Sequence, residues 1–359
     1  MSKWPARAAS LLLLLPVLAH ADDAADSVDA DTSYVAMTEE DEALVGVGTA
    51  TVPVGYVNKK DPWLDRLHGA TFNAVWRSAM HVDHWFGSTA SEVDYMQTSG
   101  SIAPSLLYDE FDGFQPRLRF QVDVPLPQLN KSLHAFIGRV NADEYVTERK
   151  PDSGAIARQY GPVEDDETIF GIRYRQPEQG GRFQADAGLR IRSPLDPFVK
   201  GSWRFQHGSS ERTLFSFRET LFWQNSEGAG ETTRLGLERI LDRQLLVRYT
   251  LSGTRSQKSP GLKGYSSILL LHGMTDRRAV AFEVGVDGAT QAEVPLHDYG
   301  FKAAYRQSML RRWLIMEVRT SVDWPKDFRW QHRHASLGLG VGCEMLLGTD
   351  EFLARPVTF

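Results

Sequence analysis

The sequence is poor in cysteine and, after its first residues, in long apolar runs. Cys343 is the only cysteine, so the chain cannot form an internal disulfide and its 359 residues must be stabilised in another way. Later apolar runs, such as residues 268–271, are far shorter than the roughly 20 residues that a membrane-spanning helix needs. The net charge of −6 is modest, which argues against non-specific binding of nucleic acid.

Motifs that bind common cofactors are also missing. The sequence has no P-loop, no Rossmann glycine fingerprint, no zinc-ribbon spacing and no EF-hand loop, so we expect no cofactor. His81, Asp83 and His84 are spaced for one face of a helix, but they lack the fourth ligand of a structural zinc site. We therefore interpret them as the polar end of a helix and predict no metal site.

The first residues have the three parts of a secretory signal peptide. Lys3 and Arg7 form a basic region, residues 11–18 form a short apolar core, and residues 19–21 (AHA) fit the small-x-small cleavage rule. No cysteine follows the core, which argues against a lipoprotein anchor. We expect residues 1–21 to be removed and the mature chain to lie outside the cytoplasm.

The segment after the cleavage site is acidic and lacks amphipathic periodicity. Residues 22–60 are predicted to be a mostly disordered tail. Asp61 and Pro62 then resemble an N-cap followed by proline at the first helical position, and apolar residues recur at steps of three and four up to Phe86. This pattern predicts an amphipathic helix over residues 61–88.

From about residue 92 the period changes to two. In residues 115–124 (QPRLRFQVDV), Leu118, Phe120, Val122 and Val124 alternate with charged or amide residues, and segments such as 312–323 repeat the pattern. Such a strand has one apolar and one polar face. In a sandwich the apolar face meets a core, whereas in an outer-membrane barrel it meets lipid and the polar face lines a lumen.

Turn residues divide residues 92–348 into about fourteen strands, and twelve or sixteen are also compatible with the pattern. The links after the even-numbered strands are tight, for example PQLNK and HGSS, whereas the links after the odd strands are more variable and include residues 143–166. An outer-membrane barrel sorts its connections in this way, and a sandwich has no reason to. We therefore predict an all-β, antiparallel, up-and-down transmembrane barrel, followed by a C-terminal tail at residues 349–359.

Four stretches carry a resemblance to a known group of proteins. FQPRLRFQVDVPLPQL, HVDHWFG, TLFWQNSEG and DWPKDFRWQHRHASLGLGVGCEMLLG resemble uncharacterised proteobacterial outer-membrane β-barrel proteins. The resemblance spans about residues 81–348 and implies a barrel in the outer membrane of a Gram-negative bacterium, but no activity. A closing strand of this kind ends at a terminal aromatic residue, whereas here TDEFLARPVTF follows the last predicted strand and ends at Phe359.

The polar face of the predicted strands is the main candidate for a functional site. The predicted lumen-lining residues are Arg117, Arg119, Asp123, Arg173, Arg175, Asp186, Arg190, Arg192, Lys200, Arg204, Arg248, Glu283, Lys302, Arg306, Glu317 and Arg319. The same register adds Arg139, Arg218, Arg234, Glu238, Asp287, Asp323 and Glu344, so that bases outnumber acids. A basic excess favours anions in a pore, but arginines paired with carboxylates can equally fill a barrel interior.

Two local features need an interpretation of their own. Glu219 falls on the apolar face of its strand, and we interpret Arg218-Glu219 as a β-bulge that resets the alternation. His334 and Ser336 are spaced like the base and nucleophile of a lipid hydrolase at the outer rim. They lack an identifiable acid and oxyanion hole, so they are weak candidates, and a polar strand end explains them equally well.

The sequence therefore favours a passive channel or transport protein for small solutes, with a basic lumen and a weak anion preference. The N-terminus is expected in the periplasm. The expected partners are outer-membrane lipid, the barrel-assembly machinery and a small anionic solute. A non-conducting structural or assembly barrel with a partner-binding N-terminus is the alternative, and a lipid hydrolase that uses His334 and Ser336 is the second alternative.

Overall fold

The structure is a computed structural model, and it describes the barrel region and one short N-terminal helix. The described residues are 63–72, 98–110, 113–150, 166–176, 182–210, 212–259, 261–275, 277–326, 328, 330 and 332–348. The signal peptide, the acidic tail, the distal half of the predicted helix with His81, Asp83 and His84, and residues 349–359 lie outside this set.

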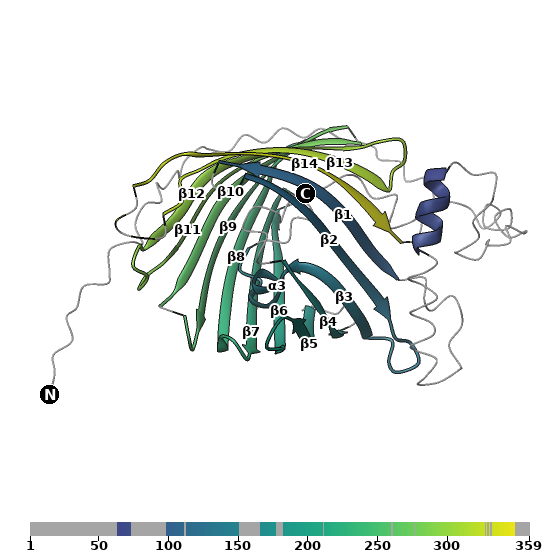
Figure 1. Ribbon diagram of the computed structural model, residues 1–359, viewed down its shortest axis with the longest axis horizontal. Coiled ribbons are helices and arrows are strands. Elements are labelled where there is room, and N and C mark those ends of the chain that lie inside the picture. Colours follow the sequence, from purple (N-terminus) through teal and green to yellow (C-terminus); the bar gives the residue numbers. More distant parts are fainter. Residues whose placement is uncertain are drawn as a thin grey trace, which may run out of the picture. The chain divides into compact units, whose positions relative to one another are not determined.

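Fourteen antiparallel strands form one closed barrel (Figure 1). Each strand pairs with its sequence neighbours, and β1 pairs with β14 to close the ring. The strands are β1 (Ser99–Asp109), β2 (Gly113–Pro125), β3 (Leu133–Asn141), β4 (Asp166–Arg175), β5 (Arg182–Ile191), β6 (Asp196–Ser210), β7 (Thr213–Gln224), β8 (Gly228–Asp242), β9 (Leu245–Ser256), β10 (Lys263–Thr275), β11 (Arg278–Ala289), β12 (Leu296–Ser308), β13 (Leu314–Asp323) and β14 (Ser336–Leu347). The predicted fold class and the predicted fourteen strands are confirmed.

The two-residue period decides which side chains face inward. In β13 the polar residues Glu317, Arg319 and Ser321 are buried inside the ring, whereas Met316 and Val318 are exposed on the outer surface. Because successive side chains of a strand point to opposite faces, a shift of one residue would put every charge outside. The barrel is thus apolar outside and polar inside, the reverse of a water-soluble protein.

The connections sort to the two ends of the barrel. The links after the even strands are residues 126–132, 176–181, 211–212, 243–244, 276–277 and 309–313, and we call this end the turn end. The links after the odd strands lie at the other end, which we call the loop end. Most of them are also short, but residues 142–165 and 324–335 form long connections there.

In the described part of the chain, two short helices accompany the strands. The helix α3 (Ala142–Thr147) follows β3 directly, and a helix at residues 63–72 contacts the turn end. There the carboxylate of Asp65 pairs with Arg311 at 2.6 Å, and the His68 ring stacks on Trp313 with ring centroids 4.2 Å apart. The His68 Nε2 atom also lies 2.9 Å from the Leu346 carbonyl oxygen. No helix among the described residues is long and apolar enough to cross a membrane.

The predicted bulge at Glu219 is wrong. The pairing of β7 with β6 and with β8 runs without a shift past this residue, and Glu219 lies opposite Trp203 and Thr233. Its carboxylate faces outward and accepts a hydrogen bond of 2.7 Å from the Thr233 hydroxyl. This cross-strand partner satisfies the carboxylate locally, so the strand keeps its alternation without an extra residue.

Gly171 on β4 provides a test of the interior packing. A Cβ atom at this position would collide with the Ala187 carbonyl oxygen and the Phe136 ring. We expect Gly171→Ala to lower the free energy of unfolding by about 1–3 kcal/mol, because overpacking forces its neighbours apart. Gly264→Ala is the matched control, since nothing lies within 4 Å of its Cβ position. Urea unfolding followed by tryptophan fluorescence measures both, and equal midpoints would contradict this account of the packing.

Candidate functional site

The charged interior of the barrel is the candidate site. Ten of the predicted lumen-lining residues are buried: Arg117, Arg119, Asp123, Arg173, Asp186, Arg190, Lys200, Arg306, Glu317 and Arg319. Arg204, Arg248, Glu283 and Lys302 are partly exposed, and Arg175 and Arg192, near strand ends, are exposed. The structure thus brings most of these side chains into one interior, where their charges must be neutralised by neighbours.

Arg139 is an exception, and the register predicted for its strand is wrong. Arg139 lies opposite Phe120 and is exposed, whereas His134, Phe136 and Val140 of the same strand are buried inside. The inward face of β3 is largely apolar because it packs against a segment inside the barrel rather than against water. The sequence of this strand alone does not show that partner.

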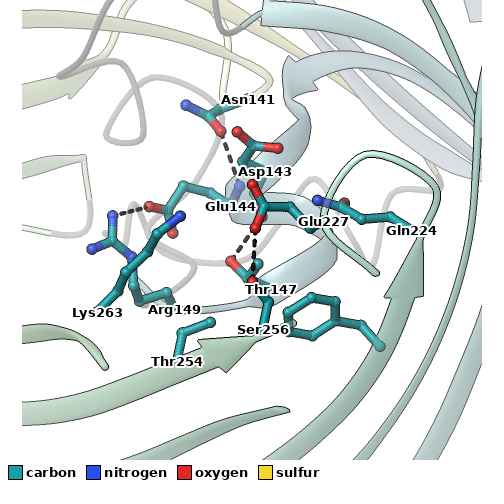
Figure 2. Close-up of a pocket in the computed structure, with 11 residues that line it drawn as sticks. Asn141, Asp143, Glu144, Thr147, Arg149, Gln224, Glu227, Thr254, Ser256 and Lys263 are labelled. Carbon is teal, nitrogen blue, oxygen red and sulfur yellow. Dashed lines mark hydrogen bonds and ion pairs between the residues drawn. The ribbon is translucent and has the colours of Figure 1, made fainter. Parts of the chain in front are cut away.

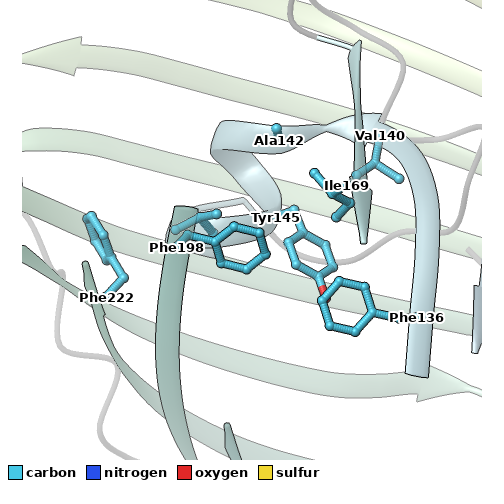
Figure 3. Packing of buried hydrophobic residues seen from close by; sticks show 8 residues of the cluster. Phe136, Val140, Ala142, Tyr145, Ile169, Phe198 and Phe222 are labelled. Atoms are coloured by element: carbon cyan, nitrogen blue, oxygen red, sulfur yellow. The ribbon is translucent and has the colours of Figure 1, made fainter. Parts of the chain in front are cut away.

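That partner is the start of the long connection after β3, residues 142–150, which we call the crossing segment. The Asn141 side chain begins α3 by accepting a hydrogen bond of 2.9 Å from the Glu144 backbone N–H. Tyr145 and Val146 then pack into an apolar cluster with Phe136 of β3 and Phe198 of β6 (Figure 3). This cluster fixes α3 against the inner wall of β3 to β7.

Tyr145 joins this cluster to the interior charges. Its hydroxyl donates to the Asp186 carboxylate at 2.8 Å and accepts from Arg173 at 2.5 Å. Arg173 also donates to Asp123 at 2.7 Å and to Asp186 at 3.0 Å. The guanidinium thus connects β2, β4 and β5 with the crossing segment. Charge-assisted bonds of this kind are stronger and more directional than neutral ones.

Glu148 binds the end of α3 to the next part of the wall. Its carboxylate accepts from Lys200 at 2.9 Å and from Arg218 at 2.7 Å, while Arg234 donates to its backbone oxygen at 2.8 Å. Glu148 belongs to the connection, outside the strands. Burial alone would raise the pKa of this carboxyl, but the charges of Lys200 and Arg218 outweigh burial and lower the pKa to about 2.

The next two residues reach the opposite wall. Arg149 donates to Asp287 of β11 at 2.9 Å, and the Lys150 ammonium lies 5.4 Å from the centre of the Tyr265 ring of β10. In a closed ring of fourteen strands, β10 is as far as possible from β3. Residues 142–150 therefore span the lumen, and any solute that crosses the barrel must pass beside them.

Two further networks of ion pairs line the walls of the barrel. Arg119 of β2 forms a bidentate pair with Asp166 at the start of β4, at 2.5 and 2.9 Å. On β12 to β14, Arg306 pairs with Glu344 at 2.6 Å and with Glu317 at 3.4 Å, and Glu317 also binds Arg319. These pairs neutralise several of the arginines that the sequence suggested for anion selection.

A pocket of about 140 Å³ lies at the loop end, between the crossing segment and the walls of β7 to β10 (Figure 2). It is lined by Asn141, Asp143, Glu144, Thr147, Arg149, Phe222, Gln224, Glu227, Thr254, Ser256 and Lys263. The Gln224 side chain is buried, and its Nε2 atom has no hydrogen-bond partner within the described structure. The pocket therefore offers a polar space beside the crossing segment, with charges of both signs.

The crossing segment changes the charge of the lumen. Asp143, Glu144 and Glu148 add carboxylates that the strand pattern did not include, and Arg149 and Lys150 add only two cations. The basic excess of the strand faces is thus partly offset. The sequence held one signal of this helix, an asparagine cap followed by two acids in the first turn, but no signal that the helix lies inside the barrel.

His334 and Ser336 occupy different environments. His334 precedes β14 and is exposed, whereas Ser336 begins β14 and is buried on the face that the inward-pointing Glu344 shares. A nucleophile at the outer rim would have to face lipid to reach a lipid substrate. Nothing in this placement favours the hydrolase interpretation.

No family model and no curated protein matches the chain. Among solved structures, the chain is similar to a KdgM porin in complex with disordered oligogalacturonate (7% identity, 68% of this chain and 98% of that chain, TM-score 0.35). It is also similar to a loop-deletion mutant of OmpT of Vibrio cholerae (10%, 69% and 98%, 0.40) and to an anion-selective porin from Comamonas acidovorans (11%, 70% and 98%, 0.39). Likeness at this level carries no argument about function.

Glu148→Gln tests whether ion pairs hold the crossing segment. Removing the carboxylate charge leaves Lys200 and Arg218 buried without their shared partner, which typically costs about 3 kcal/mol or more. We expect amide hydrogen exchange of residues 143–150 to become roughly a hundredfold faster at pH 7. Glu231→Gln is the matched control, because Glu231 is exposed on the outer surface of β8.

The same residue gives a pH dependence. A pKa lowered from 4.5 to about 2 means that Glu148 stabilises the segment fully above pH 4.5, and that this contribution is lost as pH falls towards 2. The difference in amide hydrogen exchange between Glu148→Gln and the wild type should therefore shrink as the pH falls from 4.5 towards 2. Equal exchange of the two proteins at pH 7 would show that Glu148 does not hold the segment.

Proposed function

We propose that this protein is an outer-membrane channel for small solutes, through which diffusion is passive and limited by the crossing segment. The observation that carries the proposal is the reversed polarity of the closed barrel. Apolar residues such as Leu118, Ile172, Leu221, Ile268 and Leu339 are more than 45% exposed on the outer wall, whereas the charges face inward. An apolar wall of this extent is unfavourable in water and favourable against lipid.

The arrangement of the connections supports an orientation. The first strand begins and the last strand ends at the turn end, where the links are short. Bacterial outer-membrane barrels place short turns in the periplasm and longer loops outside. The proposed location is therefore the outer membrane of a Gram-negative bacterium, with the N-terminus in the periplasm and the crossing segment entering from the outer side.

The proposed selectivity is a weak preference for anions. Arginines and lysines outnumber acids on the inward strand faces, and a basic lumen lowers the energy of an anion inside it. The preference is weak because Asp143, Glu144 and Glu148 offset part of this excess and because many arginines are paired. The polar pocket at the loop end gives a hydrated solute a place to enter beside the crossing segment.

A non-conducting barrel is the second candidate, and one observation favours it. Ion pairs from the crossing segment reach both walls, from Lys200 on β6 to Asp287 on β11, and thus divide the lumen. In that case the N-terminal residues 22–88 would carry the function by binding a periplasmic partner. The two candidates differ in one measurable property, which is conductance.

Membrane insertion can be measured directly. We expect the protein to fractionate with the outer membrane and to migrate faster on a denaturing gel before heating than after, because a closed barrel resists the detergent. Migration that does not change on heating, together with recovery in the soluble periplasmic fraction, would overturn the proposed location.

Conductance tests the channel. In planar bilayers with a salt gradient, the wild type should give small conductance steps. Its reversal potential should shift modestly from zero towards the equilibrium potential of the anion. Glu148→Gln should raise the conductance and shift the reversal potential further towards anions, because it removes a negative charge and loosens the crossing segment. Glu231→Gln, which alters the outer surface, should behave like the wild type. The complete absence of conductance for both the wild type and Glu148→Gln would favour the non-conducting barrel.

A further inference from the structure

The turn end of the barrel carries a concentration of exposed arginines. Five of them lie in or beside the turns after β8, β10 and β12: Arg239, Arg243, Arg277, Arg278 and Arg312. In the described part of these turns and strand ends, Asp242 is the exposed acid that accompanies them. By sequence, Asp276 also lies in one of these turns, so the three turns hold more arginines than acids and are basic, although the chain as a whole is acidic.

Two of these arginines are exposed at neighbouring strand ends, Arg278 at the start of β11 and Arg312 before β13. Arg278 is exposed and precedes the buried Ala279, whose neighbours Val280 and Phe282 continue the outward face of β11. Arg312 is exposed in the turn that precedes β13, beside the buried Trp313. Each of these arginines thus lies where the apolar outer wall ends, at the level expected for the phosphates of a bilayer.

The helix at residues 63–72 adds a second feature to the same place. One side of this helix, with Asp65 and His68, contacts Arg311, Trp313 and Leu346 at the turn end. Another side is apolar and exposed: Trp63 is 68% exposed and Leu67, four residues later, is 51% exposed. Next to Arg311, Leu310 is 76% exposed.

Exposed tryptophan and leucine beside exposed arginine match the chemistry of a membrane interface. Tryptophan prefers the level of the headgroups, and interfacial helices bury an apolar side among the acyl chains while cations contact the phosphates. Arg66 of the same helix is exposed and supplies a further cation. The helix contacts Arg311 in the turn that holds Arg312, and Arg278 lies opposite Gln307 at the β12 end of the same turn. The exposed apolar side chains and the arginines therefore belong to one part of the turn end.

We propose that Arg278, Arg312 and the helix at residues 63–72 form a binding site for anionic phospholipid headgroups. The arginines bind the phosphates, and Trp63 and Leu67 insert at the boundary of the acyl chains. This inference rests on the proposed membrane location. Because the turn end faces the periplasm in that orientation, the lipid source is the phospholipid of the inner leaflet rather than lipopolysaccharide of the outer leaflet.

Native mass spectrometry can count the bound lipids. The full chain would be released from nanodiscs of phosphatidylethanolamine that contain one fifth phosphatidylglycerol, with lipopolysaccharide added in a parallel sample. Arg278→Gln/Arg312→Gln should weaken phosphatidylglycerol binding about twenty-fivefold, since each arginine near an anionic surface contributes roughly fivefold. The matched control is Arg139→Gln/Arg255→Gln, which removes two exposed arginines from the outer wall towards the loop end.

The control double variant should retain wild-type binding of phosphatidylglycerol. Three results would overturn the proposed site. They are an equal loss of phosphatidylglycerol binding in both double variants, no loss in either, and a preference of the turn-end arginines for lipopolysaccharide. Heat-modifiable migration of every variant shows whether the barrel has folded. A protein that inserts into membranes but shows no lipid preference contradicts only this inference, whereas failure to insert contradicts the proposed function.

A second measurement places the helix. A spin label at Leu67→Cys, in a chain with Cys343→Ser, reports whether the site contacts lipid or water. In vesicles with phosphatidylglycerol, we expect oxygen, which partitions into the acyl chains, to relax the spin label more than a nickel chelate, which stays in water. A label that the nickel chelate reaches more readily would place the helix in the aqueous phase and contradict the insertion of Trp63 and Leu67.

Discussion

Closure of the sheet is the constraint on which the rest of the structure depends. The pairing of β1 with β14 removes both edges, so the backbone groups of the strands bond within the ring. In a bilayer, which offers no water, strands can satisfy the hydrogen bonding of their backbone N–H and C=O groups when they form such a closed ring. Closure also assigns every second residue to a confined interior, and this interior then has to accommodate the charges that the alternation puts there.

A confined charge is stable only with a partner, and this requirement explains the networks. Burying a guanidinium without a carboxylate costs several kcal/mol, so each cluster of interior arginines comes with acids on neighbouring strands. Arg306 has Glu317 and Glu344, and Arg173 has Asp123 and Asp186. On β6 to β8, however, Lys200, Arg218 and Arg234 face inward together, and it is Glu148 of the crossing segment that contacts all three. The segment thus completes the charge pairing of that wall.

The strand count and the inward arginines of β2 could be predicted because both depend on a period that is local to each strand. The crossing segment could not, since its position depends on Tyr145 meeting Phe136 and Phe198, which no local pattern links. The error at Arg139 follows from the same cause: with α3 inside, an apolar face can point inward. Glu219 shows the reverse case, because a cross-strand threonine lets a carboxylate remain on the outer surface without a bulge.

In the proposed channel, the crossing segment also determines where selectivity can arise. Wall arginines that are paired with wall carboxylates have little charge left for a passing solute, because each opposite partner cancels most of the field beyond a short distance. The segment places carboxylates at Asp143, Glu144 and Glu148 and cations at Arg149 and Lys150 across the lumen. A solute must pass close to these groups, whereas it can remain distant from any one part of the wall. These charges are paired as well, Asp143 with Arg190 and Arg149 with Asp287, so in the proposed channel the crossing segment influences ion preference through its position in the lumen rather than through unpaired charge.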